Sequence, residues 1–179
     1  AKGGYEFDGR EISALDMDEL DGIASQIRDE GINTVAITSV FSPVSDKMER
    51  EAMEQLAKTL PDVDFTLSSE IGRLGILERE NAAIMNASWR ALSERTVGAF
   101  GRALTKVGLT CPYYITQNDG TLMSRDFVQS YPVLTFASGP TNSMRGAAFL
   151  SGKLDAIVVD VGGTTTDVGA LVKGFPRPA

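Results

Sequence analysis

The chain has 179 residues, of which 42% are hydrophobic and 23% are charged, and its formal net charge at pH 7 is -7. It contains no histidine and a single cysteine, which excludes Ser-His-Asp and Cys-His nucleophiles, imidazole metal sites and an internal disulfide. The acidic balance argues against nucleic acid as a partner, and no apolar run approaches the roughly 20 residues that cross a membrane. We therefore expect a cytoplasmic protein whose chemistry uses carboxylates, hydroxyls, backbone amides or a bound cofactor.

Predicted helices alternate with predicted strands in the first part of the chain. Residues 17–30 have helical spacing, with Asp16 as the expected N-cap and Gly31 as the stop. Strands are expected over 33–40 and 63–67, separated by a helix with Ser45 as its expected cap. The apolar stripe of that helix consists of Met48, Ala52, Leu56 and Leu60. This order is typical of an α/β fold in which helices flank a sheet.

A long helical pattern runs from residue 76 to residue 107. Residues that step by four along it are Ile84, Ser88, Leu92, Thr96, Phe100 and Leu104. Gly98 and Gly101 each cost about 1 kcal/mol against Ala in an exposed helix, so a kink or a break is expected. The charged residues near its start are Glu70, Arg73, Glu78, Arg79 and Glu80. They are either a substrate or interlobe contact, or charges that complement a helix end and pair at the surface.

The C-terminal third is predicted to contain short elements and a hairpin. We expect a strand over 113–117, a turn at 118–120, a short helix from Ser124, and a helix over 142–150 that follows Ser138-Gly139-Pro140. Strands over 156–161 and 166–172 then flank a four-residue loop. The chain ends shortly after this hairpin candidate.

The hairpin carries the most informative motif, Asp160-Val-Gly-Gly-Thr-Thr-Thr-Asp167. Glycines at 162 and 163 permit positive φ and let backbone amides approach an anion, and the hydroxyls of Thr164, Thr165 and Thr166 add donors. Asp160 and Asp167 suit Mg²⁺ held through water, or an attacking water. The pattern fits a phosphate-binding hairpin, and it also fits a plain hairpin in which Gly-Gly makes the turn.

This motif resembles the second phosphate hairpin of the actin, sugar-kinase and heat-shock ATPase superfamily, and more narrowly the hydantoinase A/5-oxoprolinase family. Shorter stretches match that family in the same order. They are Leu67-Ser68-Ser69-Glu70, Glu78-Arg79-Glu80-Asn81, Asn86-Ala87, Gln117-Asn118-Asp119-Gly120, Ala137-Ser138-Gly139-Pro140 and Gly146-Ala147-Ala148. The resemblance implies a ribonuclease-H-like, two-lobed ATPase fold and the ATP-dependent opening of a cyclic amide such as a hydantoin or 5-oxoproline.

The resemblance also implies roles for individual residues. Gly162, Gly163, Thr164, Thr165 and Thr166 would bind the phosphates of ATP. Asp160 would act in catalysis by positioning Mg²⁺ or water, and Asp167 would steady the loop. Ser138 and Gly139 would turn a helix N-terminus toward an anion, unless Ser-Gly-Pro is simply an N-cap with proline in the first turn.

The first phosphate loop of the family, an Asp-Gly-Gly-Thr-type sequence, does not occur before Asp160. We therefore expect a piece of a longer protein, with residues 1–153 in the latter part of a first lobe and residues 154–179 opening the second. Its expected partners are a cyclic amide, the remainder of the parent chain and a second subunit. Two alternatives stay open: an ATP-dependent ketone carboxylase subunit of the same family, and a non-catalytic interaction domain.

Overall fold

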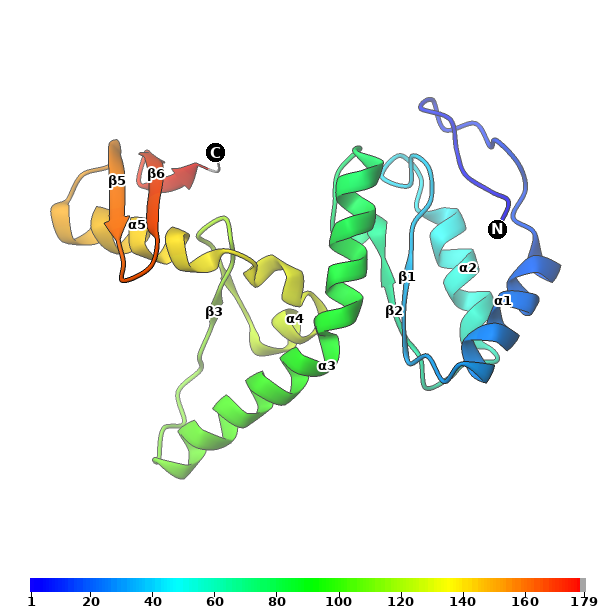
Figure 1. The fold of residues 1–179 in the computed structure, drawn as a ribbon, viewed down its shortest axis with the longest axis horizontal. Coiled ribbons are helices and arrows are strands. Elements are labelled where there is room, and N and C mark those ends of the chain that lie inside the picture. The colour runs from blue at the N-terminus through cyan, green and yellow to red at the C-terminus, as the bar shows by residue number, and fades with distance from the viewer. Residues whose placement is uncertain (178–179) are drawn as a thin grey trace. The chain divides into compact units, whose positions relative to one another are not determined.

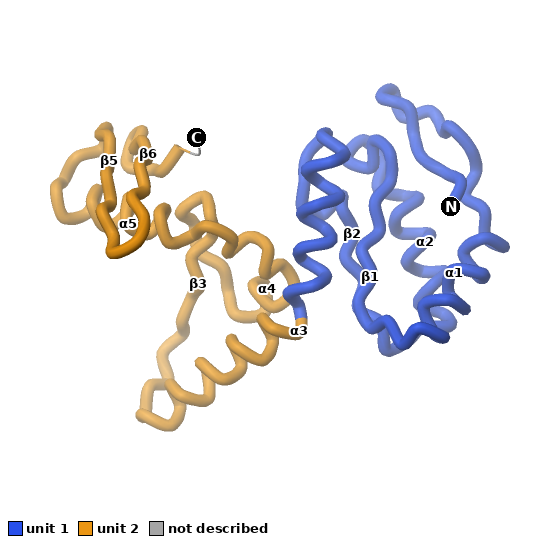
Figure 2. The backbone as a smooth tube through the Cα atoms, viewed as in Figure 1, with its two compact units in different colours: residues 1–90 blue, residues 91–179 orange. Residues whose placement is uncertain are grey.

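The computed structural model describes residues 1–177. The chain divides into two compact units, Ala1–Arg90 and Ala91–Ala179 (Figures 1 and 2). The first unit contains α1 (Met17–Asp29), β1 (Thr34–Ile37), α2 (Lys47–Ala57), β2 (Asp64–Leu67), the 3-10 turn η1 (Ser68–Glu70) and the start of α3 (Ile76–Lys106). Its core consists of Leu20, Ala24, Ile27, Ala52, Leu56 and Leu60, against which Val35, Ile37 and Phe65 of the strands pack. The apolar stripe predicted for α2 is therefore buried.

Local capping explains where the first two helices begin. The carboxylate of Asp16 accepts the backbone N–H of Glu19 at 3.1 Å, so the predicted N-cap of α1 is confirmed. The cap predicted for α2 is wrong, because that helix begins after Asp46 rather than after Ser45. Asp46 makes no side-chain cap bond, and its carboxylate instead accepts from Nε of Arg50 at 2.6 Å.

The two strands of the first unit pair in parallel, as their short helical connection requires, with Thr34 opposite Asp64 and Ile37 opposite Leu67. The N–H of Asp64 donates to the carbonyl of Asn33, so residues 33, 35 and 37 direct their backbone groups toward β2. The backbone groups of Thr34, Ala36 and Thr38 consequently point to the other edge of β1. Further along that edge, the N–H of Tyr5 donates to the carbonyl of Val40 at 3.2 Å.

The second unit begins within α3 and continues through short elements to a three-stranded antiparallel sheet. These elements are β3 (Ile115–Thr116), β4 (Leu122–Met123), α4 (Arg125–Ser130), η2 (Pro132–Thr135), α5 (Ser138–Ser151), β5 (Ala156–Val161), β6 (Thr166–Val172) and β7 (Phe175–Arg177). A small core forms around Val97, Met123 and Val128, and α5 packs against the sheet β5–β6–β7. The α/β class is confirmed, although the strands of residues 1–177 form three separate sheets instead of one mixed sheet.

Helix α3 is a single 31-residue helix, so the predicted alternative of a break at the glycines is wrong. At Gly101 an added Cβ would lie 3.0 Å from the hydroxyl of Tyr113. Three of the residues that step by four along it, Ile84, Leu92 and Phe100, are exposed. The buried positions of α3 are instead Arg79, Ala83, Asn86, Ala87 and Val97. No helix within the described residues is long and apolar enough to cross a membrane.

Candidate phosphate-binding site

The hairpin that carries the candidate site has the predicted bounds. Strands β5 and β6 pair from Ala156 opposite Leu171 to Val161 opposite Thr166, which places Asp160 directly opposite Asp167. Residues 162–165 form the connecting loop, and the N–H of Gly162 donates to the carbonyl of Thr165 at 2.9 Å. All four loop residues are exposed. The hairpin therefore presents a short polar loop, and the paired aspartates lie one residue pair away from the loop end of the strands.

The two aspartates lie on the same face of the sheet. Side chains alternate between faces along a strand, so Asp160 and Asp167 share the face of Gly169, where an added Cβ would clash with Met144 of α5. Both aspartates are half-buried, and neither carboxylate has a hydrogen bond or ion pair with any of residues 1–177. Directly opposed like charges destabilise a strand pair, and side chains in such pairs are about 5 Å apart. A cation bound between the carboxylates would relieve this repulsion.

This pair of carboxylates fits Mg²⁺ by its donor chemistry. Mg²⁺ is usually held by one or two carboxylates, several waters and the oxygens of a substrate phosphate, rather than by a full protein cage. No group of three or more His, Cys, Asp or Glu side chains suited to a metal occurs in the part of the chain that the structure describes. A metal at Asp160 would therefore need phosphate oxygens or water to complete its coordination.

The loop offers backbone donors for an anion. Within residues 1–177, no acceptor takes the N–H groups of Gly163, Thr164 or Thr165. Successive free amides of this kind can form an anion-binding concavity. Of the two reasons expected for the glycines, the first is wrong, since neither Gly162 nor Gly163 has a positive φ. Gly163 instead provides space, because a Cβ added there would meet no protein atom within 4 Å.

Ser138 and Gly139 lie in the first turn of α5, where the helix begins one residue before Gly139 and four residues earlier than expected. The N-cap position belongs to Ala137, which has a left-handed conformation with φ of 56° and gives no side-chain cap bond. Ser138 is therefore not the cap, whereas the proline at 140 does lie in the first turn. No hydrogen bond among the described residues connects Ser138 or Gly139 to the hairpin, and their contact with a phosphate stays a prediction.

The turn at 118–120 supports this unit structurally. Asn118 donates its N–H to the carbonyl of Leu134 at 2.8 Å, and its own carbonyl accepts from Oγ1 of the buried Thr141 at 2.8 Å. Gly120 has φ of +86°, and a Cβ there would lie 3.1 Å from Pro176 of β7. The turn thus joins η2, α5 and β7, which explains its polar sequence without a ligand.

A buried polar network in the first unit escaped the sequence analysis. Arg79, predicted either to contact a substrate or another lobe or to pair at the surface, is 1% exposed and donates from Nε to Oγ of Ser68 at 2.9 Å. Oγ of Ser68 in turn donates to Oε1 of the fully buried Glu49 at 2.5 Å. Glu49 also accepts the N–H groups of Ser39 and Ser69, each at 2.9 Å. The sequence does contain one signal of this network: Glu49 is a charged residue on the apolar face of its helix, next to Met48 and Ala52.

Comparison with known proteins places the chain in a family. A model described as "Hydantoinase/oxoprolinase" matches residues 79–178, and one described as "Hydantoinase/oxoprolinase N-terminal region" matches residues 1–60. The caprolactamase subunit alpha of Pseudomonas jessenii is 26% identical over 171 residues, which make up 93% of this chain and 24% of that protein.

Two solved structures share the fold. The ATP-dependent caprolactamase from Pseudomonas jessenii matches 94% of this chain with a TM-score of 0.75 and 24% identity. A nucleotide-free acetone carboxylase matches 96% of this chain with a TM-score of 0.74 and 18% identity. In each case the match covers 25% of the solved chain, so this chain spans about a quarter of the length of these relatives. The resemblance inferred from the motifs is confirmed: the chain belongs to the hydantoinase/oxoprolinase family.

Proposed function

We propose that this chain is part of an ATP-dependent enzyme that opens a cyclic amide, and that the β5–β6 hairpin holds the phosphates of the nucleotide. The observation that carries the proposal is the pairing of Asp160 with Asp167 beside three free loop amides. Family membership supports it. So does the relative named as a caprolactamase, since a lactam is a cyclic amide, and the solved structure of that enzyme is described as ATP-dependent.

The residues of this chain would bind and orient the nucleotide. Bound ATP supplies a phosphoryl group that converts a poorly electrophilic amide into one that water can attack. The N–H groups of Gly163, Thr164 and Thr165, with the hydroxyls of Thr164, Thr165 and Thr166, would donate to phosphate oxygens. Asp160 and Asp167 would hold Mg²⁺, partly through water. Phosphoryl transfer depends mainly on positioning and electrostatics, so the lack of histidine in this chain is compatible with it.

We further propose the two-lobed arrangement, with residues 1–153 in a first lobe and residues 154–179 opening a second. Two uncovered surfaces support it. The free edge of β1 presents the backbone groups of Thr34, Ala36 and Thr38. On the hairpin, the side chains that face away from α5 include Ile157, Val159 and Val161, which are 71%, 56% and 75% exposed. The relatives are about four times longer than this chain. Additional chain corresponding to that length would cover both surfaces. The word "subunit" in the name of one relative supports a second polypeptide as partner.

An NMR titration of the 179-residue chain with Mg·ATP tests the phosphate site. We expect saturable amide shifts at residues 162–167, because this loop carries the free donors. Gly163→Ala should abolish them, since the new methyl group would occupy the approach to the amides without meeting any protein atom. Gly146→Ala is the matched control, because a Cβ at this exposed helical position also meets nothing within 4 Å. Equal shifts in both variants, or none in the wild type, would contradict the proposal and favour a non-catalytic interaction domain.

The match to acetone carboxylase supports a second candidate, an ATP-dependent ketone carboxylase subunit. Both reactions would use the same hairpin, so loop variants cannot separate them. The parent enzyme, assayed with a lactam and separately with acetone and bicarbonate, would do so through the substrate that stimulates ATP hydrolysis. If only the ketone stimulates ATP hydrolysis, the substrate class is a ketone and not a cyclic amide.

A further inference from the structure

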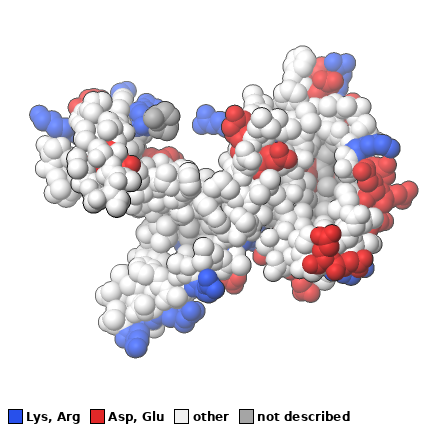
Figure 3. Space-filling view, viewed as in Figure 1, with Lys and Arg blue, Asp and Glu red and all other residues white. Residues whose placement is uncertain are grey.

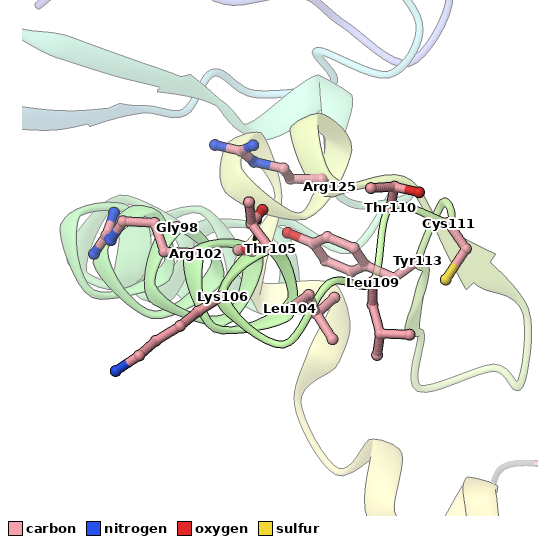
Figure 4. Close-up of a pocket in the computed structure, with 11 residues that line it drawn as sticks. Gly98, Arg102, Leu104, Thr105, Lys106, Leu109, Thr110, Cys111, Tyr113 and Arg125 are labelled. Carbon is pink, nitrogen blue, oxygen red and sulfur yellow. Dashed lines mark hydrogen bonds between the residues drawn. The ribbon is translucent and has the colours of Figure 1, made fainter.

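A pocket of about 530 Å³ lies at the C-terminal end of α3, and none of its lining residues belongs to the hairpin (Figure 4). Residues 98–106 of the helix form one wall, and the segment 109–113 with Arg125 forms the other. Its polar side chains are Arg102, Thr105, Lys106, Thr110, Cys111, Tyr113 and Arg125. No acidic residue lines it.

Specific local features build this pocket. The helix ends in a Schellman motif: the N–H of Gly108 donates to the carbonyl of Thr105, and that of Leu109 to Leu104, both at 3.0 Å. Gly108, with φ of +79°, thereby turns the chain back over the helix. Tyr113 lies against Gly101, and its hydroxyl donates to the carbonyl of Val97 at 3.3 Å. The turn and the tyrosine together hold both walls in place.

The cations of the pocket have no counter-charge. Arg102, Lys106 and Arg125 make no ion pair or side-chain hydrogen bond with residues 1–177. An adjoining pocket of about 300 Å³ shares Arg102 and Arg125 and adds Arg95, with one acid, Glu94. Residues 91–179 carry eight Lys and Arg against six Asp and Glu, whereas residues 1–90 carry nine against eighteen. Figure 3 shows the corresponding blue cluster at the C-terminal end of α3.

The helix dipole explains only part of this charge. Lys106 lies in the last turn of α3, where a cation is favourable, and its ammonium group points away from the pocket in Figure 4. Arg125 is the first residue of α4, where a cation is unfavourable. Arg102 folds back over the helix, with Nη1 3.3 Å from where a Cβ of Gly98 would lie. Neither arginine has a role in the fold that its contacts reveal.

We propose that this pocket binds a small organic anion through Arg102 and Arg125. The planar guanidinium groups suit phosphate or carboxylate oxygens, which they can bind in a bidentate manner. The hydroxyl of Thr110 adds a donor near the anionic group, and Leu104 and Leu109 give an apolar wall for the rest of the molecule. The site is independent of the nucleotide hairpin, so it stands whether or not the hairpin binds ATP.

The single cysteine gives a direct test, because Cys111 is exposed and lines the pocket. The 179-residue chain is titrated with inorganic pyrophosphate and, separately, with succinate, while amide shifts and the alkylation rate of Cys111 by iodoacetamide are followed. We expect saturable shifts at residues 98–113 and slower alkylation with at least one anion. Pyrophosphate alone would identify a phosphate ligand, and succinate alone a carboxylate ligand.

Three variants make the test specific. Arg102→Gln with Arg125→Gln should weaken binding about tenfold or more, since two charge-assisted contacts are lost. Lys153→Gln with Lys173→Gln removes the same net charge outside the pocket and should bind like the wild type. Gly163→Ala should also retain the shifts at 98–113, which separates this site from the hairpin. Absence of protection and of shifts with both anions, or equal affinity in the double arginine variant, would overturn the proposal.

Discussion

The buried Glu49–Ser68–Arg79 network leads to a sharp prediction about the stability of the first unit. Replacing Arg79 by Met keeps an unbranched side chain in the same space but removes every donor. Arg79 donates to Oγ of Ser68 and to the carbonyls of Ser39, Arg73 and Leu74, at distances of 2.5 to 3.2 Å. With 1% of the residue exposed, water cannot replace these donors.

The size of the stability loss follows from the buried acceptors that have no donor in the variant. A single unsatisfied buried polar group costs about 1–3 kcal/mol, and removal of one partner from a buried charged network costs about 3–5 kcal/mol. Arg79→Met should therefore lower the free energy of unfolding by about 3–5 kcal/mol. This is a large share of the 5–15 kcal/mol that typically stabilises a domain. Arg50→Met should cost less than about 1 kcal/mol, because the Arg50–Asp46 pair is exposed.

Urea denaturation followed by tryptophan fluorescence measures this effect, because the only tryptophan, Trp89, lies on α3 in the first unit. A double-mutant cycle with Glu49→Gln tests the connection through Ser68. The double variant should be more stable than the sum of the single effects predicts, by about 1–3 kcal/mol. If Arg79→Met changes the free energy of unfolding by less than about 1 kcal/mol, or if the two effects simply add, the network does not act as described.

Three further predictions concern other parts of the chain. The N–H of Glu19 holds the pKa of Asp16 below its ordinary value. The stability that this cap contributes should therefore be lost as pH falls through that lowered pKa. Asp16→Asn should reduce the pH dependence of the free energy of unfolding, which acid denaturation measures. Gly120→Ala should destabilise the second unit by about 1–3 kcal/mol, since its φ of +86° and the nearby Pro176 leave no relaxed position for a methyl group; thermal unfolding measures this, and an unchanged midpoint contradicts it. The purified chain alone should not turn over ATP, which a phosphate-release assay checks.

The spacing of apolar residues and the positions of residues typical of turns and helix caps predicted the local elements well. The continuous β-branched run Ile157-Val158-Val159 and the Gly-Gly loop predicted the bounds of both hairpin strands. Asp16 predicted the start of α1, because one of its carboxylate oxygens is available to the amide of Glu19 while the other pairs with Lys2 at 3.5 Å. At Asp46 a competing partner exists, the guanidinium of Arg50, and the sequence analysis chose the wrong cap.

Tertiary contacts account for what the sequence did not reveal. Arg79 lies among alternating charges that are typical of a helix surface, and only the fold shows that carbonyls of Ser39 and Leu74 surround it. The step-by-four spacing along α3 indicated a helix but not its packed face, which uses Ala83 and Ala87, whose small side chains give a weak pattern. At the candidate site, the motif indicated which residues matter. The register added that Asp160 and Asp167 face each other.

The bare face of the hairpin also makes this sheet unusually easy to redesign. Ile157, Val159 and Val161 point away from α5 and contact little within the described chain. Threonine keeps their β-branched shape and strand preference while a hydroxyl replaces a methyl group of each valine or the ethyl group of Ile157. A chain with Thr at these three positions keeps the α5-facing side, including both aspartates, intact and exposes a smaller apolar patch. Such a resurfaced hairpin would allow the phosphate loop to be studied at the high concentrations that NMR requires.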